Sequence, residues 1–430
     1  MAVAMVMRHG YRSPMYTLPN LDGPRLCCKL NDTHQRTTRT EQDDTLRRFI
    51  ASANVILASR TSSAMAFRRF GLYPNSDHCY GAQLTAHGSL QMLRLGQYFR
   101  SRYVGGSDAL LAETEANPTS KVYVRTTEYA RTFQSAVAFL FGFLSPTAAE
   151  LGSVPIDVTK SLFLCSESPT WNLTCNCQAA GQLAKIVEAL GRTEGLEALS
   201  ERRLRLDLGR VFNVSSNRLP HNGALLEVFM SHVCHGLALP CPQRSTGNAM
   251  QRQCITWTMV NDIWRRLDSS GRQRLQTEDH RSFGRLLSFP LFNEIIQNFM
   301  AIVRGERKRV FYLYSGHDKT ISAAVDALGV GDGRWPPFGS RLVFELLRHR
   351  TGQNRFFVRL LFDGKVVTDR LSGSGRRVGE SEGPKNNSQT VSDLVTVAGG
   401  ELVSLEDFSD LLLNRSFQAF GKSTYTDICG

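Results

Sequence analysis

Short apolar runs alternate along the chain with longer segments of helical periodicity. Ala2–Met7 is an uninterrupted apolar run that ends at charged residues and a glycine, a pattern typical of a buried strand. Residues 84–103 then carry apolar side chains at helical spacing, with Thr85 as the expected N-cap. The inward face of this helix is expected to carry Met92, Leu95, Gly96, Phe99 and Tyr103.

The same alternation recurs at 121–144 and again beyond residue 290. Residues 121–127 predict a second strand and 128–144 a second helix, with Tyr129, Phe133, Leu140 and Leu144 facing inward. Later elements are expected as a helix over 291–303, a strand running into a polar turn over 309–318, a helix that buries Ile321, Ala324, Val325 and Leu328, and strands over 341–350 and 355–368. Strands that alternate with helices predict an α/β fold, in which helices flank a central, mainly parallel sheet.

The regular pattern is interrupted in the middle of the chain. Between 159 and 283 it loosens into cysteine-rich, helical and basic segments, which predicts a mostly helical cap inserted into the core. The α/β core is then formed by residues 1–158 and 284–430 together. Within its second part, 372–392 is rich in glycine, serine and charge, and is expected to form a flexible surface loop.

The charge of the chain narrows the classes of ligand. The formal net charge is +12 and the pI is about 9.4, but the arginines are scattered rather than grouped in one block. This distribution argues against a nucleic-acid partner. It favours anionic substrates such as phosphates or acidic sugars, although a generally basic surface explains the charge equally well. The basic segment 201–210 is expected to be a solvated helix face, and a groove for an acidic glycan is the alternative.

Cysteines and glycosylation motifs indicate the cellular compartment. The ten cysteines are an even number, and five N-x-[ST] sequons occur, at Asn31, Asn172, Asn213, Asn386 and Asn414. Together they predict an oxidising, secretory environment. No stretch reaches the length of a membrane span, and the apolar opening is too short for a signal peptide. We therefore expect the natural protein to begin earlier, with a signal or an anchor that this sequence lacks.

The sequence evidence for a metal site is weaker than the evidence for a disulfide in the same segment. His232, Cys234, His235 and Cys241 lie close together in the sequence, but their spacing is not a standard zinc pattern. In a secretory chain a disulfide within or out of this segment is the better interpretation. No metal or other cofactor is expected.

Three predicted strands end in residues suited to bind an anion. The first ends in "MRHG" at 7–10, the second in "VRTT" at 124–127, and a third in "SGHD" at 315–318. In open α/β sheets, ligands bind at the carboxyl ends of the strands. Each motif alone has an ordinary explanation, such as a surface ion pair for Arg125 or a helix N-cap for Asp318. Their convergence on one sheet edge is what predicts a site.

The residue types at these strand ends suit phosphoryl transfer. Arg8, Arg12 and Arg125 would offer forked donors to the oxygens of a phosphate, and His317 a further donor. Guanidinium groups around a tetrahedral anion also stabilise the charge of the transition state.

Two further residues supply the reactive groups. His9 lies between the first two arginines and is the candidate nucleophile, which would form a phosphohistidine. Asp318 is the candidate general acid for the leaving oxygen. Burial would raise the pKa of this carboxyl and the arginines would lower it, so the sequence leaves its direction open.

These motifs resemble a known family. "RHGYRSP" at 8–14 is similar to the RHGxRxP signature of the histidine acid phosphatases, branch two of the histidine phosphatase superfamily. The segments 84–88, 124–135 and 315–320 resemble later blocks of that family, in the right order. The resemblance implies a phosphoglycerate mutase-like fold and a phosphomonoesterase that needs no cofactor.

Carried over residue by residue, the resemblance assigns roles to six residues. It implies that His9 is the phosphorylated nucleophile and Asp318 the proton donor. It places the phosphate between Arg8, Arg12, Arg125 and His317. Arg131 and Thr127 match positions of the same block without an assigned role.

Segments outside these blocks resemble one group within the family. They are "LYPNSDHC" at 72–79, "VCHGLALPC" at 233–241, "GRWPPFGSRLVFEL" at 333–346 and "GKSTYTDIC" at 421–429. They are similar to Golgi enzymes that remove phosphate from the xylose of the glycosaminoglycan–protein linkage region. The resemblance implies a phosphorylated xylose as substrate, the Golgi lumen as location, an N-terminal membrane anchor, and a linkage-region glycosyltransferase as a possible partner.

Other functions remain open at this point. A general lysosomal or secreted acid phosphatase, or an inositol-polyphosphate phosphatase, would carry the same catalytic blocks. A catalytically inactive glycan-binding protein could use the same basic cleft. The presence of both a nucleophile and an acid argues against that last alternative, because binding alone needs neither.

Overall fold

The structure is a computed structural model of the 430-residue chain. It describes residues 1–21, 23–24, 26, 28, 41–58, 70, 79–105, 109–115, 117–166, 175–190, 196–241, 254–349, 355–371, 395–397 and 400–430. The loop predicted at 372–392 lies outside the described residues, and so does Cys27.

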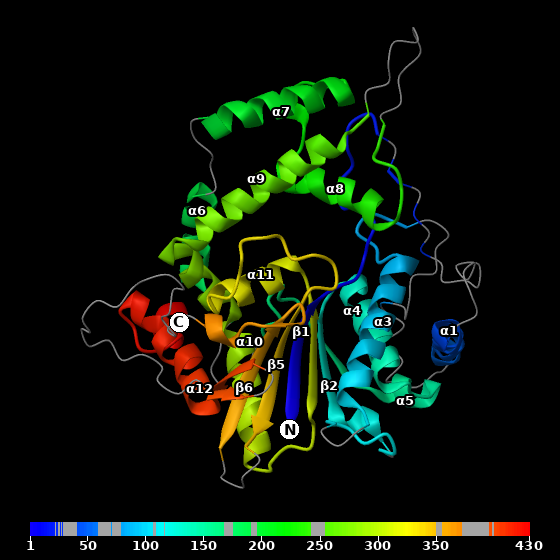
Figure 1. Ribbon diagram of the computed structural model, residues 1–430, viewed down its shortest axis with the longest axis vertical. Coiled ribbons are helices and arrows are strands. Elements are labelled where there is room, and N and C mark those ends of the chain that lie inside the picture. The colour runs from blue at the N-terminus through cyan, green and yellow to red at the C-terminus, as the bar shows by residue number, and fades with distance from the viewer. Residues whose placement is uncertain are drawn as a thin grey trace.

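A nine-stranded mixed sheet forms the centre of the molecule (Figure 1). Its strand order is β3-β2-β4-β1-β5-β6-β9-β8, with β7 paired to β6. The four strands β1, β4, β2 and β3 run parallel, as predicted, and antiparallel strands extend the sheet from β5 onward. The strands are β1 Ala2–Arg8, β2 Val122–Thr127, β3 Ile156–Thr159, β4 Phe311–Gly316, β5 Arg341–Arg348, β6 Phe356–Phe362, β7 Lys365–Val366, β8 Val395–Val397 and β9 Gly400–Ser404.

Helices cover both faces of the sheet, and β1 contributes side chains to both interfaces. Val3, Met5 and Met7 join the core beneath α3 and α4, whereas the alternate residues of β1 join the core beneath α10, α11 and α12. A strand covered on both faces reads as a continuous apolar run, which explains the opening of the sequence. The helices of the α/β core are α1 Glu41–Ala58, α3 Ala86–Tyr103, α4 Ala130–Leu144, α5 Ala148–Ser153, α10 Glu278–Val303, α11 Asp318–Ala327, α12 Leu405–Leu413 and α13 Thr426–Cys429.

The first two predicted helices form with one correction. Thr85 caps α3 by accepting a hydrogen bond from the Gly88 backbone N–H, as predicted. Every residue of α4 from Arg131 to Leu144 is buried, including its phenylalanines. Tyr129, which was expected to face inward, is instead the N-cap of α4 and is 42% exposed. The reason is that the chain leaves β2 at this point and Tyr129 lies at the end of the sheet.

Helices α3 and α4 cross at two glycines. A Cβ atom added at Gly96 would lie 2.1 Å from the Phe139 carbonyl oxygen, and one added at Gly142 would lie 2.1 Å from the Leu93 carbonyl oxygen. Both clashes are with backbone, which cannot rotate away as a side chain can. The two helices can therefore approach this closely only because neither position carries a side chain.

We expect Gly96→Ala to lower the free energy of unfolding by about 1–3 kcal/mol, the usual cost of overpacking. Urea unfolding measures this change. Gly181→Ala is the matched control, because Gly181 is also helical but a Cβ there meets nothing within 4 Å. That control is expected to be neutral or stabilising by up to about 1 kcal/mol. Equal effects at both positions would contradict the close-packing argument.

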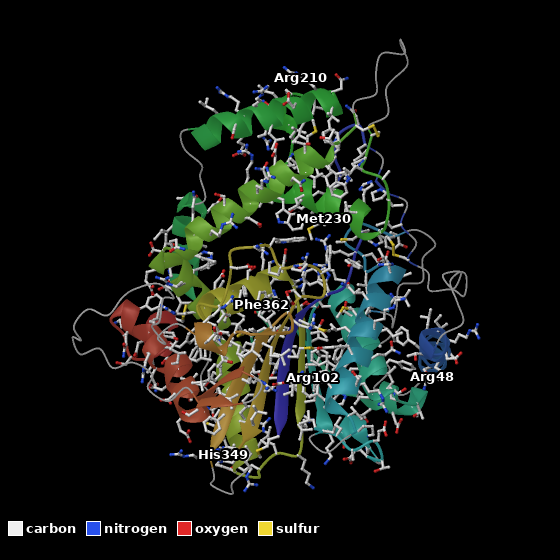
Figure 2. All side chains as sticks on the ribbon, viewed as in Figure 1. Arg48, Arg102, Arg210, Met230, His349 and Phe362 are labelled. Atoms are coloured by element: carbon white, nitrogen blue, oxygen red, sulfur yellow. A yellow bond between two sulfur atoms is a disulfide. The ribbon has the colours of Figure 1, made fainter. Side chains whose placement is uncertain are left out.

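Four helices between residues 178 and 275 form a cap over one end of the sheet (Figure 1). Its helices are α6 Gln178–Leu190, α7 Leu196–Phe212, α8 Asn222–Cys234 and α9 Trp257–Leu275. Helices α7, α8 and α9 share a hydrophobic cluster, which also includes Leu18 from the loop after β1. Figure 1 shows α8 and α9 above the carboxyl ends of the parallel strands, with α7 outermost. Arg202, Arg203 and Arg210 of α7 are exposed, which supports the prediction of a solvated basic face. Arg210 is labelled on this helix in Figure 2.

Helix α10 begins earlier than predicted. It starts at Glu278, capped by Thr277, and continues through Pro290. The sequence pattern predicts its start at Leu291, directly after that proline. By length and composition α10 could cross a membrane, but most of its apolar window is buried within the fold, as in the core helix of a globular protein.

Four disulfides staple the described chain. They join Cys28–Cys79, Cys165–Cys175, Cys177–Cys429 and Cys241–Cys254. The last confirms that Cys241 belongs to a disulfide rather than to a zinc site. Cys177–Cys429 ties the start of cap helix α6 to the C-terminal helix α13. Cys234 keeps a free thiol among the described residues. This pattern fits a secretory protein.

Candidate active site

The loop after β1 is held closely by its neighbours. The backbone N–H of His9 donates to the Gly316 carbonyl at the end of β4, and that of Gly10 donates to the Ser135 hydroxyl in α4. A Cβ at Gly10 would lie 2.6 Å from the Gly88 carbonyl oxygen of α3. Glycine is therefore required for the loop to turn between the sheet and α3.

His9 is buried and its hydrogen bonding fixes its neutral tautomer. The side-chain Nδ1 lies 2.9 Å from the Gly10 carbonyl oxygen, which can only accept, so Nδ1 carries the hydrogen. The lone pair of the ring is then on Nε2. Burial holds the pKa of His9 well below its usual value, and the nearby Arg131 and Arg8 lower it further. The imidazole is neutral and able to act as a nucleophile.

Three buried arginines surround this histidine. Arg8, Arg12 and Arg131 are 0%, 6% and 9% exposed. The Nε atom of each is buried and has no acceptor among the described residues. Burial, with a neighbouring arginine, lowers the pKa of Arg8 and of Arg131 to about 10. A bound anion such as phosphate would accept hydrogen bonds from these unpaired donors. It would also offset the repulsion between the crowded guanidinium groups.

The structure does not bring Arg125 into this cluster. On β2 its side chain shares a face with Tyr123, and its guanidinium bonds the Glu294 carboxylate of α10, the Tyr123 hydroxyl and the Leu164 carbonyl. Arg131 lies in the cluster instead, from the first turn of α4. Its Nη2 is 3.4 Å from Nδ1 of His317. Arg125 therefore serves a buried ion pair between the sheet and α10, and the third arginine of the cluster is Arg131.

His317 and Asp318 lie where β4 meets α11. His317 Nε2 is 2.9 Å from the hydroxyl of Thr127, and its ring centroid is 5.6 Å from that of His9. Burial and Arg131 lower the pKa of His317 to about 3, so this ring is neutral as well. With Nδ1 facing the Arg131 guanidinium, Nε2–H donates to Thr127. This accounts for the threonine that the sequence left without a role.

Trp335 holds the carboxylate of Asp318. The indole N–H donates to Oδ2 at 2.8 Å, and the Lys319 backbone N–H donates to Oδ1 at 2.9 Å. Burial raises the pKa of Asp318, but Arg8, 3.9 Å away, and these two donors outweigh it and lower the pKa to about 2. Arg8 in turn stacks 4.0 Å from the ring centroids of Trp335 and Phe338.

The cap contributes one carboxylate that sequence reasoning missed. Glu227 of α8 accepts hydrogen bonds from Nη1 of Arg12 at 2.5 Å and from the Met15 backbone N–H at 2.6 Å, and it is 6% exposed. It fixes the guanidinium of Arg12 and ties the cap to the loop after β1. One signal was visible in the sequence, because Glu227 is the single charge within the apolar run "ALLEVF" at 224–229.

The described geometry therefore brings together His9, Arg8, Arg12, His317 and Asp318 from the sequence prediction, and adds Arg131, Glu227 and Trp335. A neutral, buried imidazole among three arginines, at the carboxyl edge of an α/β sheet, is suited to phosphoryl transfer. The chain belongs to the histidine phosphatase superfamily (branch 2), whose family model matches residues 1–190 and 261–363. It is a phosphoric monoester hydrolase of the histidine acid phosphatase type.

Two relatives and one solved structure illustrate what the chain is similar to. The chain is 27% identical to 2-phosphoxylose phosphatase 1 of Homo sapiens over 370 residues, which are 85% of this chain and 71% of that protein. It is 29% identical to the testicular acid phosphatase of Homo sapiens over 279 residues, 62% of this chain and 59% of that one. The phytase of Citrobacter braakii shares the fold with a TM-score of 0.53 at 16% identity, over 96% of each chain.

Proposed function

We propose that this protein hydrolyses the 2-phosphate of a xylose in the glycosaminoglycan–protein linkage region, through a phosphohistidine. The observation that carries the mechanism is the neutral His9 surrounded by three buried arginines with unpaired Nε donors. The similarity to 2-phosphoxylose phosphatase 1 over most of the chain supports the substrate. A membrane anchor, the Golgi lumen and a glycosyltransferase partner belong to the same proposal, and the disulfides agree with a secretory location.

The proposed reaction has two steps. Nε2 of His9 attacks phosphorus, the bond from phosphorus to the sugar oxygen breaks, and Asp318 gives its proton to that oxygen. Water then attacks the phosphohistidine, with Asp318 accepting a proton, and releases phosphate. Arg8, Arg12 and Arg131 hold the phosphate oxygens throughout. His317, whose Nε2–H donates to Thr127, supports the Arg131 guanidinium beside them.

A substrate comparison tests the proposed specificity. We expect turnover of a linkage oligosaccharide carrying xylose 2-phosphate to exceed that of inositol hexakisphosphate at least a hundredfold in kcat/KM. 4-Nitrophenyl phosphate serves as the control, because its good leaving group reports the phosphatase chemistry alone. Comparable kcat/KM on all three esters would overturn the xylose assignment and leave a general acid phosphatase. No phosphate release from any of them would favour the glycan-binding alternative.

A further inference from the structure

The segment that carries Trp335 runs from the end of α11 to the start of β5, and its far end is bound to the catalytic loop. The Gly339 backbone N–H donates to the His9 carbonyl at 3.2 Å, and the Ser340 carbonyl accepts from the Arg8 backbone N–H at 2.8 Å. These bonds fix the end of the segment beside the residues that attack and bind the phosphate in the proposed reaction.

The indole of Trp335 lies between the proton donor and a phosphate-binding arginine. Its N–H donates to Oδ2 of Asp318 at 2.8 Å, and the guanidinium of Arg8 lies 4.0 Å from the centroid of its ring. Among the described residues, no other side chain donates a hydrogen bond to the Asp318 carboxylate, whose second donor is the Lys319 backbone N–H. Since the Asp318 side chain is 33% exposed, packing alone does not fix its orientation.

Helix α9 of the cap contacts the same segment with its backbone. A Cβ added at Gly271 would lie 2.0 Å from the Gly333 carbonyl oxygen, and one added at Gly333 would lie 2.5 Å from the Arg272 backbone nitrogen. Gly333 also has a φ of +76°, which favours glycine. Figure 1 shows α9 above α11, after which this segment begins. Because both partners are backbone, the position of α9 sets the position of the chain two residues before Trp335.

The chemistry of the indole suits a partner that must gain and lose a proton. A neutral N–H donor orients a carboxylate without the charge of a lysine or an arginine, which would hold the carboxyl ionised more strongly. With Oδ2 bound to the indole, Oδ1 is left to carry the proton. A phenyl ring at the same place would still stack on Arg8 but could not orient the carboxylate. The N–H is therefore the part of this side chain that packing does not require.

We propose that Trp335 positions Asp318 for proton transfer, and that α9 of the cap holds Trp335 in place through the contact between Gly271 and Gly333. This inference rests on the proposed phosphatase function, and it adds that the proton step depends on how the cap packs on the core. Attack by His9 on an ester with a good leaving group needs no proton, so it should be insensitive to this contact.

Two esters that differ in their need for a proton test the role of the N–H. Trp335→Phe keeps an aromatic ring against Arg8 and removes the donor. It is expected to lower the single-turnover phosphorylation rate on glycerol 2-phosphate at least tenfold, and on 4-nitrophenyl phosphate threefold at most. Trp257→Phe, at an exposed tryptophan of α9, is the matched control and should change neither rate. Equal losses on both esters, or no loss on either, would overturn the positioning role.

A pair of glycine variants tests the role of the cap helix. Gly271→Ala is expected to lower the rate on glycerol 2-phosphate at least threefold more than the rate on 4-nitrophenyl phosphate. Gly209→Ala in α7 is the control, because a Cβ there would lie 2.7 Å from the Val214 carbonyl oxygen, a contact within the cap. It should lose stability without changing the ratio of the two rates. Thermal unfolding checks each fold, and Gly333→Ala replaces Gly271→Ala if that protein does not fold. An unchanged ratio would overturn the link to α9.

The indole signal of Trp335 provides a measurement that needs no activity. The chain has four tryptophans, so Trp335→Phe assigns this signal in a ¹H–¹⁵N spectrum. Asp318→Ala, which removes the acceptor, and Gly271→Ala should both shift the signal, whereas Gly209→Ala should leave it in place. Absence of phosphate release from both esters by the wild-type protein would contradict the proposed function instead. In that case a signal that Asp318→Ala shifts supports the positioning contact, and a signal that it leaves unchanged overturns it.

Discussion

His9→Ala is expected to lower phosphate release by at least about 10⁴-fold, because it removes the atom that attacks phosphorus. The remaining arginines would still bind the ester, so the loss should appear in kcat rather than in KM. Acid quenching of the wild-type protein with ³²P-labelled substrate should trap a labelled phosphoenzyme, which His9→Ala should not form. The neutral tautomer fixed by the Gly10 carbonyl leaves Nε2 as the expected site of the label.

His349→Ala is the matched control for this variant. His349 lies at the end of the sheet far from the cap, as Figure 2 shows, and its replacement should leave turnover and labelling unchanged. Since His9 is almost fully buried, thermal unfolding of His9→Ala is needed to separate a lost nucleophile from a lost fold. A folded His9→Ala protein with activity near wild type would sink the phosphohistidine mechanism.

The strands that position the site could be predicted because each is short, apolar and followed by polar residues. The continuous apolar run Ala2–Met7 predicts that β1 is buried on both faces, as it is in the structure. The start of α10 could not be predicted in the same way. Its first twelve residues mix charged and apolar residues. Pro290 lies in the helix interior, whereas proline is usually found in the first turn of a helix. Packing against α11 and the sheet sustains this helix, and such contacts are not visible in local periodicity.

The arginines show where strand-end reasoning reaches its limit. Arg125 precedes the end of β2 by two residues, so its side chain shares a face with Thr127 but lies deeper in the fold. Its partner Glu294 is 169 residues away in sequence and could not be inferred. Arg131 sits beyond the strand, in the first turn of α4, where its guanidinium reaches His317. The choice between Arg125 and Arg131 therefore required the three-dimensional structure.

Glu227 and Trp335 could not be found by the same approach for a different reason. Both lie outside the catalytic blocks, and they act by binding Arg12 and Asp318. A lone charge in an apolar helix indicates a buried partner but does not identify it. The structure identifies the partner of Glu227 as Arg12.

The low pKa of Asp318 in the free protein conflicts with its proposed role as a proton donor. With a pKa of about 2 in the free protein, this carboxyl is ionised across the physiological range and has no proton to give. The arginine that lowers its pKa most is Arg8, the same group that would bind phosphate. A bound phosphate neutralises Arg8 and adds negative charge beside Asp318, and both changes raise the pKa of the carboxyl. The substrate itself would therefore convert Asp318 into an acid.

Asp318→Asn is expected to lower kcat for alkyl phosphates by about 10²–10⁴-fold, the usual contribution of a general acid. Its effect on 4-nitrophenyl phosphate should stay below tenfold in the phosphorylation step, because nitrophenolate leaves without a proton. The wild-type rate on alkyl esters should fall as pH rises through the pKa of Asp318 in the complex, and the variant should lack this limb. Asp279→Asn, an exposed aspartate in the first turn of α10, is the control. Single-turnover rates that fall equally on both esters would show that Asp318 holds the phosphate or its arginines instead of donating a proton.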